Sequence, residues 1–299
     1  MVFTKSRLVV SLIVACAAAL STAARAGEAP IAKGATLHRV SSEFTFTEGP
    51  ARNSHGDVYF TDQPSNRILR WSENGSIVEV TTDAGRANGL YFDRDGNLLA
   101  CADLNNELWK ITPTGEIEVL VGRVHGKRLN GPNDLWISPA GGLYFTDPFF
   151  QRDYWTRRGK EIDVEGVYFL SSEGQVRLVA DDLVKPNGII GTADGSTLYV
   201  ADIGDDKTYR YEVQADGSLE SKTLFAPMGS DGMTLDEQGN VYLTGDGVTI
   251  FNRDGKKISH IDVPEKWTAN ITFGGKERRT LFITASKSIY TLEMQVAGQ

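Results

Sequence analysis

Short apolar segments of five residues recur along this chain, and most are rich in β-branched and aromatic residues. Turn signals such as Gly141-Gly142 precede them, and runs bounded in this way are typical of β-strands in hairpins. Six segments align with one another at intervals of 40, 45, 55, 43 and 40 residues. They span residues 58–62, 98–102, 143–147, 198–202, 241–245 and 281–285.

A third apolar run follows each of these segments, and a fourth follows in five of the six units. The third runs are 67–71, 107–111, 166–170, 208–213, 248–252 and 288–292. The fourth runs are 77–80, 117–121, 176–179, 219–225 and 258–261. Four antiparallel strands repeated at such intervals are typical of propeller blades, which shield most strand edges. The sequence therefore predicts an all-β, six-bladed β-propeller.

The two ends of the repeat array complement each other. The sixth unit stops after its third strand, whereas a spare strand over residues 36–40 precedes the first unit. Pairing these ends would supply the missing outer strand and close the ring, which a β-helix or an open solenoid would not require. We expect residues 27–299 to form one propeller, closed by the N-terminal strand in the last blade.

An innermost strand begins ten or eleven residues before each aligned segment, and each start carries one oxygen-bearing side chain at the same position. Innermost strands of a propeller line its channel, so these positions are expected to form a ring at one mouth. The ring consists of Glu48, Asn88, Asn133, Asn187, Asp231 and Asn270.

Carboxylate and amide oxygens without Cys or His suit a hard cation: calcium first, then magnesium or manganese, with a poorer fit to zinc. A single Asn-Gly or Asp-Gly pair is better explained as a turn, but turn formation does not explain Glu48 in the same register. The two acids together carry a charge of −2, which one divalent ion would neutralise. The predicted metal ligands are Glu48, Asn133, Asn187 and Asp231, and the predicted substrate contacts are Asn133, Asn88 and Asn270.

Other candidate side chains fall outside this register. Asp62, Asp147 and Asp202 end strands that alternate away from the channel, so we expect turn or inter-blade hydrogen bonding there, and the same at Asp103. An insertion over residues 148–161 is rich in aromatics and arginines, and it is either a loop that covers the substrate or a surface excursion. Four histidines are expected at the surface: His38, His55, His125 and His260.

The N-terminal segment differs from the rest of the chain. Lys5 and Arg7 precede an apolar run from Leu8 to Leu20, and small residues around Ala26 offer a cleavage site. These features predict a signal peptide over residues 1–26 and an exported protein, periplasmic or secreted. An alternative is a lipobox at residues 13–16 that would leave Cys16 lipidated. No other stretch is apolar and long enough to span a membrane.

Cleavage would leave Cys101 as the only cysteine, so no internal disulfide is expected, and its apolar strand predicts a buried, inert thiol. Loss of the three basic residues of the leader would change the formal net charge from −8 to −11. That charge and the lack of a basic stripe argue against a nucleic-acid partner. We expect a monomer or a weak homo-oligomer.

Several motifs resemble those of the SMP-30/gluconolactonase/regucalcin-like propellers, to which the squid-type phosphofluoridases are similar. In order along nearly the whole chain they are EGP at 48–50, RLNGPND at 128–134, YFTDP at 144–148, EGVY at 165–168, PNG at 186–188, SDGM at 230–233 and NITFGG at 270–275. Each motif is weak alone, and their order and spacing make the resemblance specific.

The resemblance implies a divalent cation held at Glu48, Asn187 and Asp231, with Asn133 at the ion or at the substrate. It also implies hydrolysis of sugar lactones with Asp231 as the acid/base residue. One position departs from the animal branch, in which an Arg two residues before the position of Asn133 contacts the sugar; in this chain that position is Gly131. The resemblance therefore implies lactone hydrolysis as a class and does not single out gluconate lactone.

The residues themselves agree with this chemistry. Lactone opening needs an electrophile at the carbonyl oxygen and a base for water, which a divalent ion and a carboxylate beside it can supply. A water activated mainly by the metal is an equal alternative to Asp231, and amide groups at Asn133 or Asn88 can support the developing charge. Two other functions stay open: a phosphotriesterase-like hydrolase at the same metal, and a periplasmic binding propeller with only a structural calcium.

Overall fold

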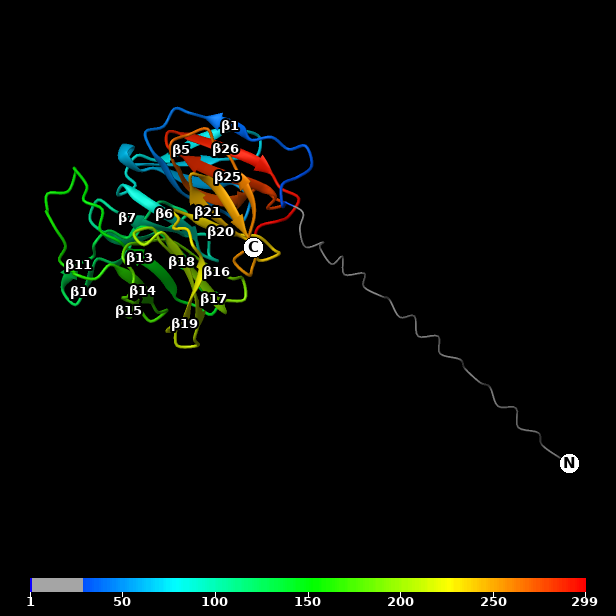
Figure 1. Ribbon diagram of the computed structural model, residues 1–299. Coiled ribbons are helices and arrows are strands. Elements are labelled where there is room, and N and C mark those ends of the chain that lie inside the picture. Colours follow the sequence, from blue (N-terminus) through cyan, green and yellow to red (C-terminus); the bar gives the residue numbers. More distant parts are fainter. Residues whose placement is uncertain (2–28) are drawn as a thin grey trace.

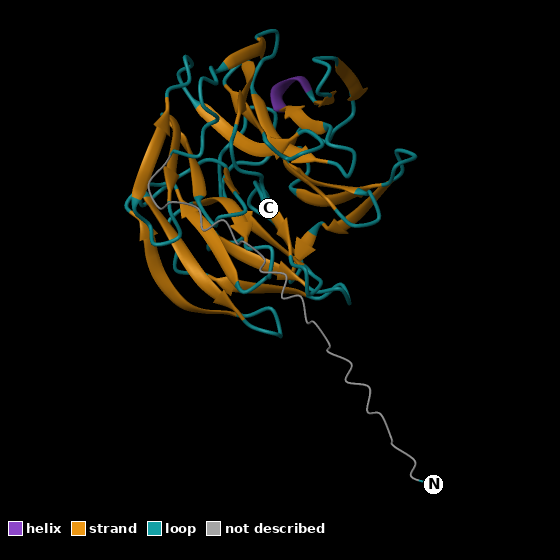
Figure 2. Cartoon of the chain, turned by 90° about the vertical axis from the view of Figure 1, so that its right-hand side faces the viewer, coloured by secondary structure: helices purple, strands orange, loops and turns teal. Residues whose placement is uncertain are grey.

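The computed structural model describes Met1 and residues 29–299, in which six four-stranded antiparallel sheets surround a central axis (Figures 1 and 2). This arrangement confirms the predicted six-bladed β-propeller. The signal peptide and the alternative lipid site at Cys16 lie outside the described residues, apart from Met1. Among the described residues, no helix is long and apolar enough to cross a membrane.

The first three blades follow the predicted repeat, and in each blade the strands succeed one another from the axis outward. Blade 1 contains β2 (Thr47–Arg52), β3 (Val58–Asp62), β4 (Arg67–Trp71) and β5 (Ile77–Thr81). Blade 2 contains β6 (Ala87–Phe92), β7 (Leu98–Ala102), β8 (Glu107–Ile111) and β9 (Ile117–Val121). Blade 3 contains β12 (Leu135–Ile137), β13 (Leu143–Asp147), β14 (Gly166–Leu170) and β15 (Val176–Ala180).

The last three blades complete the ring. Blade 4 contains β16 (Pro186–Gly191), β17 (Thr197–Asp202), β18 (Lys207–Val213) and β19 (Leu219–Ala226). Blade 5 contains β20 (Met233–Leu235), β21 (Val241–Gly245), β22 (Gly247–Phe251) and β23 (Lys257–Ile261). Blade 6 contains β24 (Thr268–Gly274), β25 (Thr280–Ala285), β26 (Ser288–Glu293) and, outermost, β1 (His38–Ser41).

Closure of the ring occurs between the two ends of the chain, as predicted. Strand β1 pairs antiparallel with β26, with His38 opposite Thr291 and Arg39 opposite Tyr290. The strand starts two residues later than the expected 36–40 and continues past a bulge to Ser41. Figure 1 shows β1, in blue, beside the red strand β26.

Two small elements were not predicted. A one-turn 3-10 helix, Gln63–Ser65, follows β3, and a hairpin of β10 (Arg123–Val124) and β11 (Lys127–Arg128) leads into blade 3. The hairpin turns at His125 and Gly126, both with positive φ, as a two-residue turn between twisted strands requires. Strands this short carry little periodic signal, so the apolar pattern did not predict them.

The core lies between adjacent blades. Trp136 and Tyr144 of blade 3 stack at 5.8 Å between ring centroids, and Trp136 covers Gly191 of blade 4, where a Cβ would lie 2.3 Å from the indole. Cys101 is completely buried, and burial raises the pKa of its thiol well above the usual value. The predicted inert thiol is therefore confirmed as a buried core residue.

Candidate functional site

The six ring positions lie together at the mouth of the channel where the innermost strands begin. Glu48, Asn88 and Asn187 are each the second residue of β2, β6 and β16, and Asn270 is the third residue of β24. Asn133 and Asp231 occupy the same register two residues ahead of the shorter strands β12 and β20. All six are buried except Asp231, which is partly exposed.

Threonines on the second strands hold neighbouring blades in register at this mouth. Thr61 Oγ1 donates to Asn88 O at 3.2 Å, and Thr146 Oγ1 donates to Asn187 O at 2.7 Å. Thr244 Oγ1 repeats the contact with Ala269 O of blade 6 at 2.9 Å. These threonines come from the aligned segments of the sequence repeat, so the repeat encodes the spacing of the ring as well as the strands.

Glycines beside the ring residues allow the innermost strands to approach closely. A Cβ at Gly49 would lie 2.0 Å from Asn88 O, and one at Gly232 would lie 2.1 Å from the side chain of Asn270. A side chain at either position would push the ring apart. The glycines that follow Glu48 and Asp231 therefore serve this packing.

Asp231 lies among polar groups that orient its carboxylate. Trp267, from the loop before β24, donates its Nε1 hydrogen to Asp231 Oδ2 at 2.6 Å, and the amide of Asn187 also hydrogen-bonds to Asp231. Burial raises the pKa of Asp231 to about 6, while the bonds from Trp267 and Asn187 and the charge of Arg152 counter this rise. The carboxyl group is therefore poised to exchange a proton near neutral pH.

Glu48 and Asp231 form a coupled pair of acids. Burial, and then the charge of Asp231, raise the pKa of Glu48 well above the usual value, although the Gly49 amide donates to Glu48 Oε2 at 3.1 Å. Two neighbouring carboxylates with little access to water repel each other unless a proton or a cation lies between them. The pair therefore favours a positive charge at the centre of the ring.

The residues present fit a hard divalent cation. Asn187 Oδ1 is buried without a hydrogen-bond partner among the described residues, while the amide of the same side chain bonds to Asp231. An unpaired buried oxygen beside two carboxylates is the donor that calcium or magnesium accepts. No group of three His, Cys, Asp or Glu residues is placed for metal binding within the described part of the chain, so amide oxygens would complete the ligand set.

The remaining amides of the ring differ in their contacts. The side chains of Asn88 and Asn133 make no hydrogen bond to other described residues, so both can contact a ligand. Asn270 is engaged: its Oδ1 accepts from the Ile271 amide at 2.7 Å, and it also bonds to Asp134 across the channel. Its role as a substrate contact stays a prediction.

Asp134 is a buried acid that the sequence interpretation did not select. It bonds to the amides of Leu135 and Ile189 and to Asn270, while burial raises its pKa to about 7. Four blades have glycine after the ring residue, and an acid at that position in blade 3 is the signal that could have identified it.

Comparison with known proteins identifies the family. Residues 46–287 match the model of the SMP-30/Gluconolactonase/LRE-like region, which covers most of the chain. The chain belongs to this family. The gluconolactonase of Zymomonas mobilis is 29% identical, with 87% of this chain and 81% of that protein covered.

Two further proteins are similar to this chain. A solved gluconolactonase structure from Xanthomonas campestris superposes with a TM-score of 0.83 at 29% identity, covering 89% of this chain and 91% of that one. The diisopropyl-fluorophosphatase of Loligo vulgaris is 26% identical, covering 87% of this chain and 93% of that protein.

The aspartates that end the second strands have structural contacts, as predicted. Asp62 accepts from the amides of Thr45 and Phe46, both at 3.1 Å, and so holds the loop that leads into β2. Asp147 and Asp202 repeat this contact in blades 3 and 4, with bonds of 2.7 to 2.9 Å. These carboxylates order the loops beneath the site and do not project into the channel.

Asp103 also makes inter-blade hydrogen bonds, as predicted, but its carboxylate accepts them from side chains and not from the amides of a preceding loop. Its Oδ2 accepts from Arg152 Nε at 3.0 Å, from the Tyr154 hydroxyl and from Gln63 Nε2 at 3.3 Å. The Trp155 indole donates to its backbone oxygen at 2.7 Å. Asp103 thus anchors the insertion that no other blade carries.

The insertion over residues 148–161 lies on the same face of the propeller as the ring. It leaves β13 at Asp147, next to the residues that precede β12. It packs against Gly131, where a Cβ would lie 3.1 Å from Asp103 Oδ1 and 3.2 Å from Trp155. The place at which the animal branch has an arginine is therefore filled by the insertion.

The four histidines lie outside the ring. All four histidines are exposed, as predicted.

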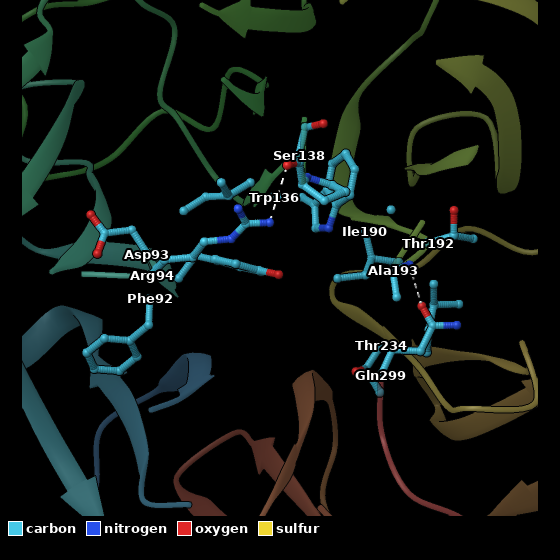
Figure 3. A pocket seen from close by; sticks show the side chains of 15 residues that line it. Phe92, Asp93, Arg94, Trp136, Ser138, Ile190, Thr192, Ala193, Thr234 and Gln299 are labelled. Atoms are coloured by element: carbon cyan, nitrogen blue, oxygen red, sulfur yellow. Dashed lines mark hydrogen bonds between the residues drawn. The ribbon is translucent and has the colours of Figure 1, made fainter. Parts of the chain in front are cut away.

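A hollow of about 310 Å³ lies at the opposite mouth, where Ala193 N donates to Gln299 Oε1 at 2.8 Å (Figure 3). A second cavity of about 220 Å³ follows the channel from Asp134 and Asn270 to Gln299. The last residues of the chain thus lie across the far end of the channel, close to the central axis of the propeller (Figure 2).

Proposed function

We propose that this protein hydrolyses sugar lactones with the help of one divalent cation, calcium first, held by Glu48, Asn133, Asn187 and Asp231. The unpartnered Asn187 Oδ1 beside the coupled acids Glu48 and Asp231 is the observation that carries the metal site. Lactone hydrolysis is supported by the gluconolactonase relatives from Zymomonas mobilis and Xanthomonas campestris. Zinc, magnesium and manganese are the alternative cations.

The reaction requires water to attack the lactone carbonyl and the ring C–O bond to break, which yields a hydroxy acid. When bound, the cation would polarise the carbonyl oxygen and make water easier to deprotonate. Asp231 would take the proton of the attacking water, because its raised pKa suits proton transfer near neutral pH. The amides of Asn133 and Asn88 would donate to substrate oxygens.

A panel of lactones tests this proposal directly. The metal-stripped protein should not release acid, and calcium, magnesium, manganese or zinc should restore acid release to different extents. Asp231→Asn should lower kcat by about 10² to 10⁴ while the fold is retained by circular dichroism. The matched control is Asp95→Asn at an exposed turn, which should behave as wild type. Full activity in Asp231→Asn would assign the base to another group.

A phosphotriesterase-like activity is the second candidate, supported by the similarity to the Loligo vulgaris enzyme. It requires turnover of a fluorophosphate or an aryl phosphotriester without turnover of lactones. A binding propeller with only a structural calcium is the third, and it requires calcium-induced thermal stabilisation without turnover of either panel.

We further propose that the protein is exported, periplasmic or secreted, after removal of residues 1–26, with lipidation at Cys16 as the alternative. Mass spectrometry of the mature N-terminus distinguishes the two, because a lipidated chain would begin at Cys16. Light scattering of the purified protein tests the expected monomer or weak homo-oligomer.

A further inference from the structure

Arg152 is held beside the site by a fixed anchor. Its Nε donates to Asp103 Oδ2 at 3.0 Å, and that carboxylate is only 2% exposed. Tyr154 and Gln63 donate to the same oxygen, so three donors from two elements fix the position of Asp103. Arg152 also lies over the ring of Phe150, with 5.7 Å between Cζ and the centroid. These contacts restrict the plane of the guanidinium group.

The rest of the guanidinium group is unused. Only Nε of Arg152 bonds to Asp103, and neither Nη atom has a hydrogen-bond acceptor within the described part of the chain. The side chain is 27% exposed, so the two Nη groups are accessible to a ligand. A planar fork with free donors is suited to binding two neighbouring oxygen atoms at once.

The two Nη groups of Arg152 lie at the mouth of the channel that carries the ring. Asp103 lies near Gly131, where an added Cβ would be 3.1 Å from Asp103 Oδ1, and Gly131 lies two residues before the candidate ligand Asn133. The positive charge of Arg152 also lies close enough to lower the pKa values of both Glu48 and Asp231. The guanidinium group therefore lies beside the reacting centre, on the insertion that blade 3 alone carries.

We propose that Arg152 is a substrate-binding residue that makes the site selective for polyhydroxylated lactones. Its two Nη groups donate to neighbouring hydroxyl oxygens of the sugar ring, and Asp103 holds the fork in the required plane. A lactone without hydroxyl groups offers the fork no acceptors. This inference rests on the proposed lactone hydrolysis and adds the determinant of its substrate class.

The test compares glucono-δ-lactone with δ-valerolactone, which has the same ring without hydroxyl groups. In Arg152→Met, the ratio of kcat/KM for the hydroxylated lactone to that for the plain lactone should fall by about tenfold or more. The fall should appear mainly in KM. Arg152→Lys, which keeps the charge but loses the fork, should recover only part of the ratio. An unchanged ratio, or equal losses on both lactones, would overturn the proposal, because a role limited to loop anchoring affects both substrates alike.

Two controls separate this inference from the proposed function. Arg158→Met removes an exposed arginine of the same insertion and should leave the ratio unchanged. Binding of gluconate to the calcium-loaded protein, measured by calorimetry, does not require turnover, and Arg152→Met should weaken it by about tenfold or more. Calcium affinity should be unchanged or higher in Arg152→Met, since a nearby positive charge has been removed. Equal gluconate binding by wild type and Arg152→Met would also overturn the proposal, whereas an absence of lactone turnover with intact gluconate discrimination would contradict only the proposed function.

Discussion

Trp267 donates its indole hydrogen to Asp231 across 2.6 Å, so a side chain from the loop before blade 6 orients the candidate base of blade 5. Trp267 is 36% exposed, and its ring therefore forms part of the rim of the mouth. Because the donor bonds to the ionised form of the carboxylate, it lowers the pKa of Asp231 and opposes the effect of burial. The base is thus tuned by a residue outside the ring.

Replacement of this donor should shift the pH dependence of catalysis. Trp267→Phe keeps an aromatic ring but removes the N–H, so the pKa of Asp231 should rise by about one unit or more. Since Asp231 must be ionised to accept a proton, the acidic limb of the kcat profile should move to higher pH by the same amount. Tyr209→Phe removes an aromatic donor to Asp205 on an outer blade strand and serves as the control. An unshifted profile in Trp267→Phe would show that Asp231 does not control this limb.

Glu48→Gln should have opposite effects on stability and on metal affinity. The buried Glu48 carboxyl has a raised pKa, so its ionisation above the ordinary value of 4.5 destabilises the metal-free fold. Removal of this charge should raise the melting temperature of the metal-free protein at neutral pH. It should also weaken calcium binding by about tenfold or more, because one anionic ligand is lost. Thermal melts with and without calcium measure both effects, and a loss of stability without calcium would contradict the prediction.

Calcium binding to wild type should release protons below neutral pH, because both acids have raised pKa values and the cation competes with their protons. Calorimetry at pH 6 in two buffers with different ionisation enthalpies measures this release. Glu48→Gln should release fewer protons than wild type. Equal heats in the two buffers would indicate that neither acid takes part in binding.

Gly131→Ala should loosen the insertion. The new Cβ would lie 3.1 Å from Asp103 Oδ1 and 3.2 Å from Trp155, which is tighter than ordinary contact. We expect a loss of about 1–3 kcal/mol in the free energy of unfolding, together with a lower kcat/KM. Gly122→Ala is the matched control, because its Cβ would meet no atom closer than 3.7 Å. Equal stability of the two variants in urea titrations would show that the insertion accommodates the new Cβ without a loss in the free energy of unfolding.

Stability of the metal-free protein should fall as the pH rises from about 4 to about 7. Burial raises the pKa of Asp147 to about 7, although the amides of Asn130 and Gly131 oppose this shift. The folded state therefore binds this proton more tightly than the unfolded state, and stability decreases by about 1.4 kcal/mol per unit of pKa elevation until the group is ionised. Asp147→Asn should be less stable at low pH but should lose less stability over this range. A slope equal to that of wild type would contradict the assignment.

Much of the architecture follows from the sequence because each blade repeats one local pattern. Strands such as Val58–Asp62 and Leu143–Asp147 were predicted with the bounds that the structure has, since turns bound their apolar runs closely. The ring was predicted for the same reason: a shared register places Glu48 and Asp231 at one mouth whatever the loops do. Boundaries moved where pairing continues past the apolar run, as in β1.

The residues missed by sequence interpretation come from outside the repeat. Arg152 and Trp267 lie on loops, whose separation from the ring residues differs in each blade, so no register relates them to the site. The direction of their side chains depends on contacts with Asp103 and Asp231 that form only in the folded protein. Asp134 could have been identified from the sequence, because it replaces a glycine of the repeat. Its hydrogen bond across the channel to Asn270 could not have been predicted.

Because β1 pairs with β26, the first strand of the ring finds its partner only after the other blades have been synthesised. Five blades are continuous stretches of chain and can assemble as they emerge, whereas blade 6 takes its outer strand from the opposite end. A chain that ends early, before β26, would leave a ring with an open seam and an unpaired strand edge. Such an edge invites pairing with other chains. A complete β26 is therefore needed both to close the propeller and to prevent association with other chains through the open edge.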